Sequence, residues 1–263
     1  MPAKPRRPAG GPRILVANDD GIAAPGLAVL ERIAHAMSDD VWVVAPETEQ
    51  SGAAHSLTIN EPLRLRKIAE RRFAVHGTPT DCVMLAVYHL LRGEKRPDLL
   101  LSGVNAGANL GEDVTYSGTV AAAIEGALLG IRSIAFSQVG GLDGPMHWET
   151  AARHGPEVIR RLEGLEWLDG VLINVNFPSV SPEKVTGIEA TLQGQRDTGD
   201  LLIDQRTDMR GIPYFWIGFR QRIGTPASDT DFAAVARGAV SVTQLRVNLS
   251  DAETRDRLSA ILR

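Results

Sequence analysis

Two neighbouring carboxylates, Asp19 and Asp20, follow the apolar run ILVA at residues 14–17. Such a run predicts a strand buried on both faces, so these acids stand where the chain leaves the core. Their negative charges repel each other unless water screens them or a cation holds them. The stretch NDDG at residues 18–21 is also good turn material, and taken alone it fits a plain turn as well as a metal site.

Other polar residues follow later predicted strands. Ser51 lies in the loop after residues 41–46, and Asn105 and Asn109 lie in the glycine-rich stretch that follows residues 97–101. A solvated serine and a flexible loop are the plain alternatives. Ligands of parallel sheets gather beyond the carboxyl ends of the strands, which places these side chains near the two acids. Oxygen ligands suit Mg²⁺, Mn²⁺ or Ca²⁺, whereas a closed zinc site would need Cys or His.

Ser117, Gly118 and Thr119 open a predicted small-residue helix at residues 118–130. The free N–H groups and the positive dipole end of a helix start form an anion site. Capping by Ser117 or Thr119 is compatible with that role. A phosphate would therefore lie between the helix start and a cation bound at the carboxylates. Asn18, Asn105 and Asn109 are further candidate contacts of this phosphate.

Two histidines, His55 and His76, lie near strand ends, and neither has a metal-type spacing with another histidine. Packing in a loop or the core is the default interpretation for both. His55 is the candidate proton donor for a leaving group.

Alternating strand and helix patterns predict an α/β fold with a mainly parallel sheet covered on both faces. The expected strands are residues 14–17, 41–46, 72–77, 97–103, 131–137 and 171–178. The expected helices begin at Pro25 and near Pro79, and span residues 118–130 and 149–162.

After residue 186 the pattern changes. Residues 187–200 and 211–222 predict the strands of an extended hairpin that leaves the main body, with an ordinary antiparallel edge as the alternative. Exposed aromatic residues favour cover by a partner chain, and here they are Tyr214, Phe215, Trp216 and Phe219. A helix capped by Asp229 or Thr230 and a closing strand follow. We expect a disordered basic tail at 1–12, a catalytic domain at 13–185 and an oligomerisation region at 186–263.

Composition limits the classes of function. The 263 residues are 43% hydrophobic with a net charge of −4, which is typical of a soluble globular protein and does not suggest a nucleic-acid partner. No stretch approaches the roughly 18 apolar residues of a membrane span. The basic N-terminus lacks an apolar signal region. Cys82 is the single cysteine, so no intrachain disulfide forms, which fits a cytoplasmic location.

Seven ordered motifs resemble the SurE family of metal-dependent nucleoside-monophosphate phosphatases. They are NDDG--APG, EQSG--HSLT, GTPTDCV, SGVNAGANLG, YSGTVAAAIEGALLG, NVNFP and DTDFAAVARGAVSVT. The resemblance implies a Rossmann-like domain with an extended C-terminal hairpin, and a homodimer or homotetramer joined by exchanged terminal elements. It implies one divalent ion per subunit, Mg²⁺ or Mn²⁺ with Ca²⁺ as a further candidate, held by Asp19, Asp20, Ser51 and Asn105. Its phosphate-contacting loop matches Ser117, Gly118 and Thr119.

The chain departs from the family pattern in three places. Ala17 stands where a serine is common, Glu47 and Thr48 where the family often has Asp-Arg, and Arg132 where it often has proline. The pair at 47–48 changes the charge of its loop and leaves the substrate preference open.

The expected reaction is direct attack of water on the phosphorus of a nucleoside 5′-monophosphate. Further candidate substrates are 3′-monophosphates and short polyphosphate. Asn18 is placed to contact the phosphate or its leaving group. An aspartyl-phosphate route is the mechanistic rival, but those phosphatases carry D-x-D where this chain has N-D-D. A nucleotide sensor without turnover is the alternative function, and an interaction scaffold is a third. The paired acids favour catalysis, since a passive phosphate site has no use for added negative charge.

Overall fold

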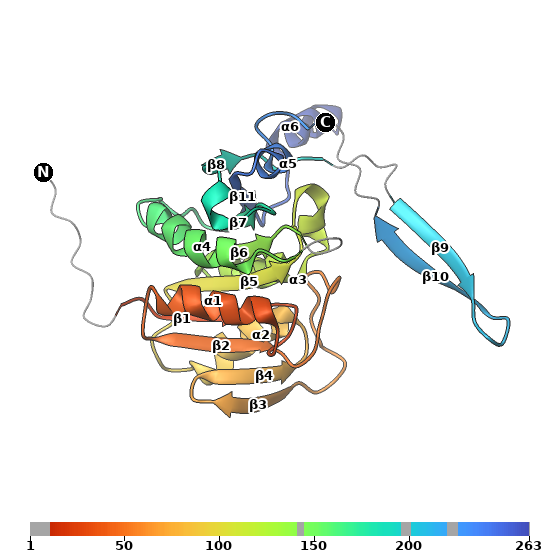
Figure 1. Cartoon of the computed structure of the whole chain (residues 1–263). Coiled ribbons are helices and arrows are strands. Elements are labelled where there is room, and N and C mark those ends of the chain that lie inside the picture. The colour runs from red at the N-terminus through yellow and green to blue at the C-terminus, as the bar shows by residue number, and fades with distance from the viewer. Residues whose placement is uncertain (1–10, 141–144, 196–200, 220–225, 263) are drawn as a thin grey trace, which may run out of the picture.

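Strand β1 (Ile14–Ala17) consists of four apolar residues, all buried, and lies near the centre of a large sheet (Figure 1). The structure is a computed structural model that describes residues 11–140, 145–195, 201–219 and 226–262. Within these residues the main sheet has nine strands. In spatial order they are β3 (Arg64–Ala69), β4 (Arg72–His76), β2 (Val41–Pro46), β1, β5 (Leu99–Ala106), β6 (Arg132–Gln138), β7 (Val171–Phe177), β11 (Val240–Arg246) and β8 (Ile188–Thr191).

The six strands from β4 to β7 run parallel, as the alternating sequence pattern predicts. Strand β3 pairs antiparallel with β4, and β11 pairs antiparallel with β7. From β1 the chain adds β2 and β4 on one side, and later β5, β6 and β7 on the other. The strand order therefore reverses between β1 and β5, and ligands of open α/β sheets bind beyond the carboxyl ends of the strands at such a point.

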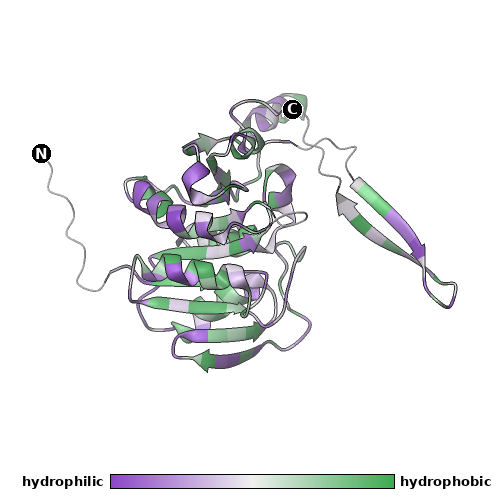
Figure 2. Cartoon of the chain, in the orientation of Figure 1, coloured by the Kyte–Doolittle hydropathy of each residue, from purple (hydrophilic) through white to green (hydrophobic). Residues whose placement is uncertain are grey.

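Helices cover both faces of the sheet. Helices α1 (Pro25–His35) and α4 (Trp148–Leu162) pack on one face, and α2 (Pro79–Leu85) and α3 (Gly118–Leu128) pack on the other. Successive residues of β1 serve the two cores in turn: Ile14 faces the first, and Leu15 faces the second. Strands β1, β2 and β5 in the middle of the sheet are accordingly hydrophobic along most of their length, whereas the edge strand β3 carries hydrophilic residues (Figure 2). The parallel, doubly covered sheet is therefore confirmed.

Shorter elements complete the described chain. A π-helical segment (Ala86–Leu90) continues α2, and two 3₁₀ turns cover Gly111–Thr115 and Pro182–Lys184. Helix α5 (Asp231–Ala236) follows Thr230, the residue predicted as one of two possible caps, and packs against β11. Helix α6 (Ala252–Ile261) ends the chain with none of its residues buried. No helix among the described residues is both long and apolar enough to cross a membrane.

The hairpin exists, but its first strand was assigned wrongly. Residues 188–191 form β8 and pair with β11 in the main sheet, whereas the arm is built from β9 (Leu201–Thr207) and β10 (Pro213–Phe219). The arm extends away from the body (Figure 1), and Phe215 and Trp216 on it are 58% and 61% exposed. Strands β8 and β11 belong to the main sheet although they follow residue 185. The assignment of residues 186–263 to oligomerisation stays a prediction. Of the tail predicted at residues 1–12, residues 1–10 lie outside the described part of the chain.

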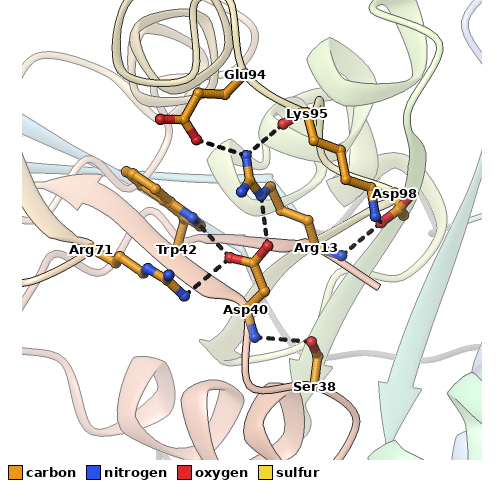
Figure 3. A network of polar contacts seen from close by, with 8 residues as sticks. All are labelled: Arg13, Ser38, Asp40, Trp42, Arg71, Glu94, Lys95 and Asp98. Carbon is orange, nitrogen blue, oxygen red and sulfur yellow. Dashed lines mark hydrogen bonds and ion pairs between the residues drawn. The ribbon is translucent and has the colours of Figure 1, made fainter. Parts of the chain in front are cut away.

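A polar network ties strands together at the end of the sheet opposite to the predicted site (Figure 3). Arg13 Nε donates to Asp40 Oδ2 over 2.8 Å, and the indole N–H of Trp42 and a guanidinium N–H of Arg71 donate to Asp40 Oδ1. Both guanidinium groups lie 5.8 Å from the Trp42 ring centroid. Burial opposes ionisation of Asp40, but the Arg13 contact outweighs it and lowers the pKa of this carboxyl below its usual value.

We expect Asp40→Asn to lower the free energy of unfolding by about 1–2 kcal/mol at pH 7, because hydrogen bonds to charged groups are lost. A lowered folded-state pKa gives stability that is complete above the unfolded-state value of about 3.9 and is lost as the pH falls through the folded-state pKa. Urea unfolding at pH 7 and pH 3 should therefore show a difference between variant and wild type that shrinks in acid. Asp256→Asn, at an exposed pair with Arg255, is the control and should change nothing measurable.

Candidate active site

Asp19 and Asp20 lie where β1 ends, at the predicted edge of the sheet. The turn that carries them is closed by Asn18, whose Nδ2 donates to Gly21 O over 2.9 Å. Gly21 has a φ of 100°, which favours glycine at this position. Among the described residues, Asn18 Oδ1 is buried and has no hydrogen-bond partner. A buried acceptor without a protein donor is open to a hydrogen bond from water or from a ligand.

The Asp19 carboxylate is 4% exposed and accepts a hydrogen bond from the Thr119 hydroxyl. Burial raises the pKa of Asp19 to about 6; the Thr119 hydroxyl opposes this rise, and the neighbouring charge of Asp20 adds to it. A carboxylate that the fold has buried next to another carboxylate is costly without a cation.

Asp20 is half-buried and holds the end of β5. Its Oδ2 accepts from the backbone N–H of Ala106 over 3.2 Å, which places Asn105 next to the acids. Burial raises the pKa of Asp20, and the charge of Glu49 adds to the rise. We predicted that Asn105 follows the strand. Strand β5 instead continues to Ala106, so Asn105 lies within it. Its Nδ2 donates to Gly107 O over 3.1 Å.

Ser51 approaches from a third segment. The backbone N–H of Gln50 donates to Asp19 O over 2.8 Å, which ties this loop to the end of β1. Ser51 is exposed, and its hydroxyl donates to Glu49 Oε1 over 2.9 Å. Glu49 is a third acidic side chain near the site that was not predicted, although it stands two residues before the predicted ligand Ser51.

The start of α3 lies directly against the acids. Ser117 caps the helix by accepting from the N–H of Val120 over 3.1 Å, as predicted. A Cβ added to Gly118 would be 2.7 Å from Asp19 Cβ and 3.0 Å from its Oδ2, so only glycine leaves room for this contact. The first N–H groups of a helix have no partner within it. Four segments thus meet at one point. They are the chain just after β1, the end of β5, the loop at residues 47–51 and the start of α3.

Two of the predicted residues lie in other networks. The Asn109 amide donates to Ser137 Oγ over 2.8 Å, and the Asn109 backbone binds Asn176. The His55 ring contacts Glu125 Oε2 over 3.1 Å. Glu125 is eight residues after Ser117 on α3, or about 12 Å along the helix axis. Roles for Asn109 at the phosphate and for His55 in proton donation stay predictions.

The donor chemistry fits a hard divalent cation. Asp19, Asp20, Ser51 and Asn105 offer oxygen atoms, and a cation would offset the buried charge of Asp19. Within the described part of the chain, no group of three or more His, Cys, Asp or Glu side chains could hold a metal ion. Neutral oxygen atoms must therefore complete any coordination that the two carboxylates begin.

Comparisons with known proteins find relatives over nearly the whole chain. The family model described as "Survival protein SurE" matches residues 14–200. The "5'-nucleotidase SurE" of Methylobacterium sp. (strain 4-46) is 56% identical over 95% of this chain and 99% of its own length. The protein of the same name from Brucella canis is also 56% identical, over 95% and 98% of the two chains. A crystal structure of the SurE protein from Aquifex aeolicus superposes with a TM-score of 0.81, at 38% identity over 95% of this chain and 99% of that one.

Proposed function

The chain belongs to the SurE family, and we propose on this basis that it is a 5′-nucleotidase that needs a divalent metal ion. Its substrates would be nucleoside 5′-monophosphates, with 3′-monophosphates and short polyphosphate as further candidates. The observation that supports the proposal most is the buried Asp19, which neighbours Asp20 and packs against the start of α3. A binding protein for phosphate would gain nothing from two carboxylates at this point.

We assign Asp19, Asp20, Ser51 and Asn105 to a site for one divalent ion per subunit, Mg²⁺ or Mn²⁺ with Ca²⁺ as a further candidate. Such an ion, when bound, neutralises phosphate charge and makes water more acidic. The protein's own part is to hold the carboxylates in place before substrate arrives, which the Thr119 hydroxyl does for Asp19 and the Ala106 N–H does for Asp20. The Gln50 N–H holds the backbone carbonyl of Asp19.

The start of α3 is assigned to the phosphate. We assign N–H groups of the first helical turn, from Gly118 onward, to the equatorial phosphate oxygens, whose charge grows in the transition state. The backbone N–H of Thr119 faces the Asp19 carboxylate, so Thr119 would act on the phosphate from beside that acid. Asn18 Oδ1 is an acceptor, which suits a proton of water or of the leaving hydroxyl better than a phosphate oxygen. His55 is the remaining candidate for protonating the leaving nucleoside.

We further propose a homodimer or homotetramer that works in the cytoplasm without a membrane or a nucleic-acid partner. Exposed aromatic residues on the β9–β10 arm support the assembly, because large apolar patches on soluble proteins are often covered by a partner. The single, buried Cys82 supports the reducing location.

A substrate panel tests the activity. Phosphate release from AMP, GMP and p-nitrophenyl phosphate should require added Mn²⁺ or Mg²⁺ and should stop when the protein is dialysed against a chelator. Adding the metal back should restore it, since a denatured protein would not recover. Turnover that survives chelation would contradict the metal dependence, and AMP binding without any phosphate release would favour the nucleotide sensor.

A further inference from the structure

The loop that carries Ser51, residues 47–58 and here called the Ser51 loop, has no buried residue. Ser51 and Gly52 are exposed, and the loop is tied to the end of β1 by the backbone bond from Gln50 to Asp19 O. Its middle is held to the region around α3 by the backbone bond from Ala54 N–H to Tyr116 O and by the contact of His55 with Glu125. The part after His55 is fixed from its other end. The segment GTPTDCV at residues 77–83 lies at that end and has no role in the site built above.

Asp81 binds the end of the Ser51 loop with both carboxylate oxygens. The Thr58 hydroxyl donates to Asp81 Oδ2 over 2.6 Å, and the Thr58 backbone N–H donates to Oδ1 over 3.1 Å. Asp81 is 2% exposed and Thr58 is partly exposed, so these bonds are partly shielded from water. The two residues are 23 positions apart in the sequence.

The same helix start makes a second bond to the loop. Thr78 caps α2: its hydroxyl accepts from the N–H of Asp81 over 3.2 Å, while its own N–H donates to Asp81 Oδ2 over 2.8 Å. The Thr78 hydroxyl also donates to Ser56 O over 2.8 Å. A helix cap needs only the bonds between Thr78 and Asp81. The bonds to Ser56 and Thr58 serve the loop.

We propose that Asp81 is a positioning residue for metal binding, because by holding Thr58 it fixes the loop that presents Ser51 to the cation. The proposal rests on the function proposed above. Ordering the loop in advance removes an entropic cost from the binding step, and a loop freed at Thr58 must be ordered when the metal binds. Loss of the hydrogen bonds between Thr58 and Asp81 therefore weakens metal affinity and leaves turnover at saturating metal almost unchanged.

Thr58→Val is the sharpest test. It removes the hydroxyl donor but keeps the shape and the backbone N–H, while Asp81 Oδ2 still accepts from Thr78. We expect the Kd for Mn²⁺ to rise roughly tenfold, because the lost free energy is about that of one hydrogen bond. Titration calorimetry or electron paramagnetic resonance of free Mn²⁺ measures this Kd. The kcat for AMP at saturating Mn²⁺ should stay within about twofold.

Two matched variants separate positioning from general damage. Thr58→Ser keeps the hydroxyl and should restore the Kd to near the wild-type value. Thr186→Val removes a hydroxyl that donates to Arg237 O, far from the site in the sequence and fold, and should leave Mn²⁺ binding unchanged. The metal-free melting temperature of Thr58→Val should fall by less than about 3 °C.

The inference is overturned if Thr58→Val binds Mn²⁺ with the wild-type Kd, or if Thr186→Val weakens binding equally. A fall in kcat with an unchanged Kd would also contradict it. Failure of the proposed function looks different, since the wild-type protein would then bind Mn²⁺ yet release no phosphate from any substrate of the panel.

Discussion

Asp19→Asn is expected to reduce the kcat/KM for AMP, at saturating Mn²⁺, by at least about a thousandfold. The change removes one of the two carboxylate charges that would hold the cation. Asp19 is the more buried of these two carboxylates. A thousandfold loss corresponds to about 4 kcal/mol of transition-state stabilisation, which is in the range of a metal's effect on phosphoryl charge. Initial rates of phosphate release over a range of AMP concentrations measure it.

Stability measurements separate this loss from unfolding. Burial disfavours the ionised form of Asp19, as its raised pKa of about 6 indicates, so the neutral amide should fold at least as well in the metal-free protein. Asp39→Asn changes an exposed aspartate before β2 and serves as the control with wild-type activity. An Asp19→Asn protein that keeps more than about a tenth of the wild-type rate would contradict the assigned role.

The sequence predicted best what depends on buried, regular patterns. The run ILVA predicted a buried strand, the small residues after Ser117 predicted a helix, and the structure has both. The acids after β1 and the asparagine on β5 were brought together because strand ends of a parallel sheet share one edge. Ser51 and the start of α3 followed from the same rule.

The errors occur where local pattern carries little information. Strand β3 was missed because nearly every residue of its sequence RLRKIA is exposed or charged, as at many sheet edges. Helix α6 has no buried face from which its period could be recognised. Strand β5 was cut short because Gly103 interrupts it. The φ of Gly103 is +121°, and the register shifts between Ser102 and Asn105, as at a β-bulge.

Long-range contacts account for the rest. Nothing near Asp81 in the sequence indicates that it binds Thr58, since the two meet only after the sheet and α2 have formed. His55 and Glu125 are 70 residues apart in the sequence, and their contact directs the imidazole ring toward Glu125. The sequence gives no sign of this contact. The sequence pattern identifies groups at the end of a sheet, whereas packing decides which of them face one another.

Gly118→Ala is expected to lower the kcat/KM for AMP about a hundredfold, although it adds a single methyl group. The added Cβ would lie 2.7 Å from Asp19 Cβ and 3.1 Å from Pro79 Cγ, so either the helix start or the carboxylate must move. A displacement of about 1 Å between the phosphate-binding amides and the metal-binding acid is enough for such a loss. Gly164→Ala is the matched control, because its added Cβ meets nothing within 4 Å. Steady-state kinetics on both variants, with circular dichroism to verify folding, measure the effect. Near-normal rates in Gly118→Ala would mean that the start of α3 does not need to touch Asp19, and the phosphate site would then have to be sought elsewhere on this edge of the sheet.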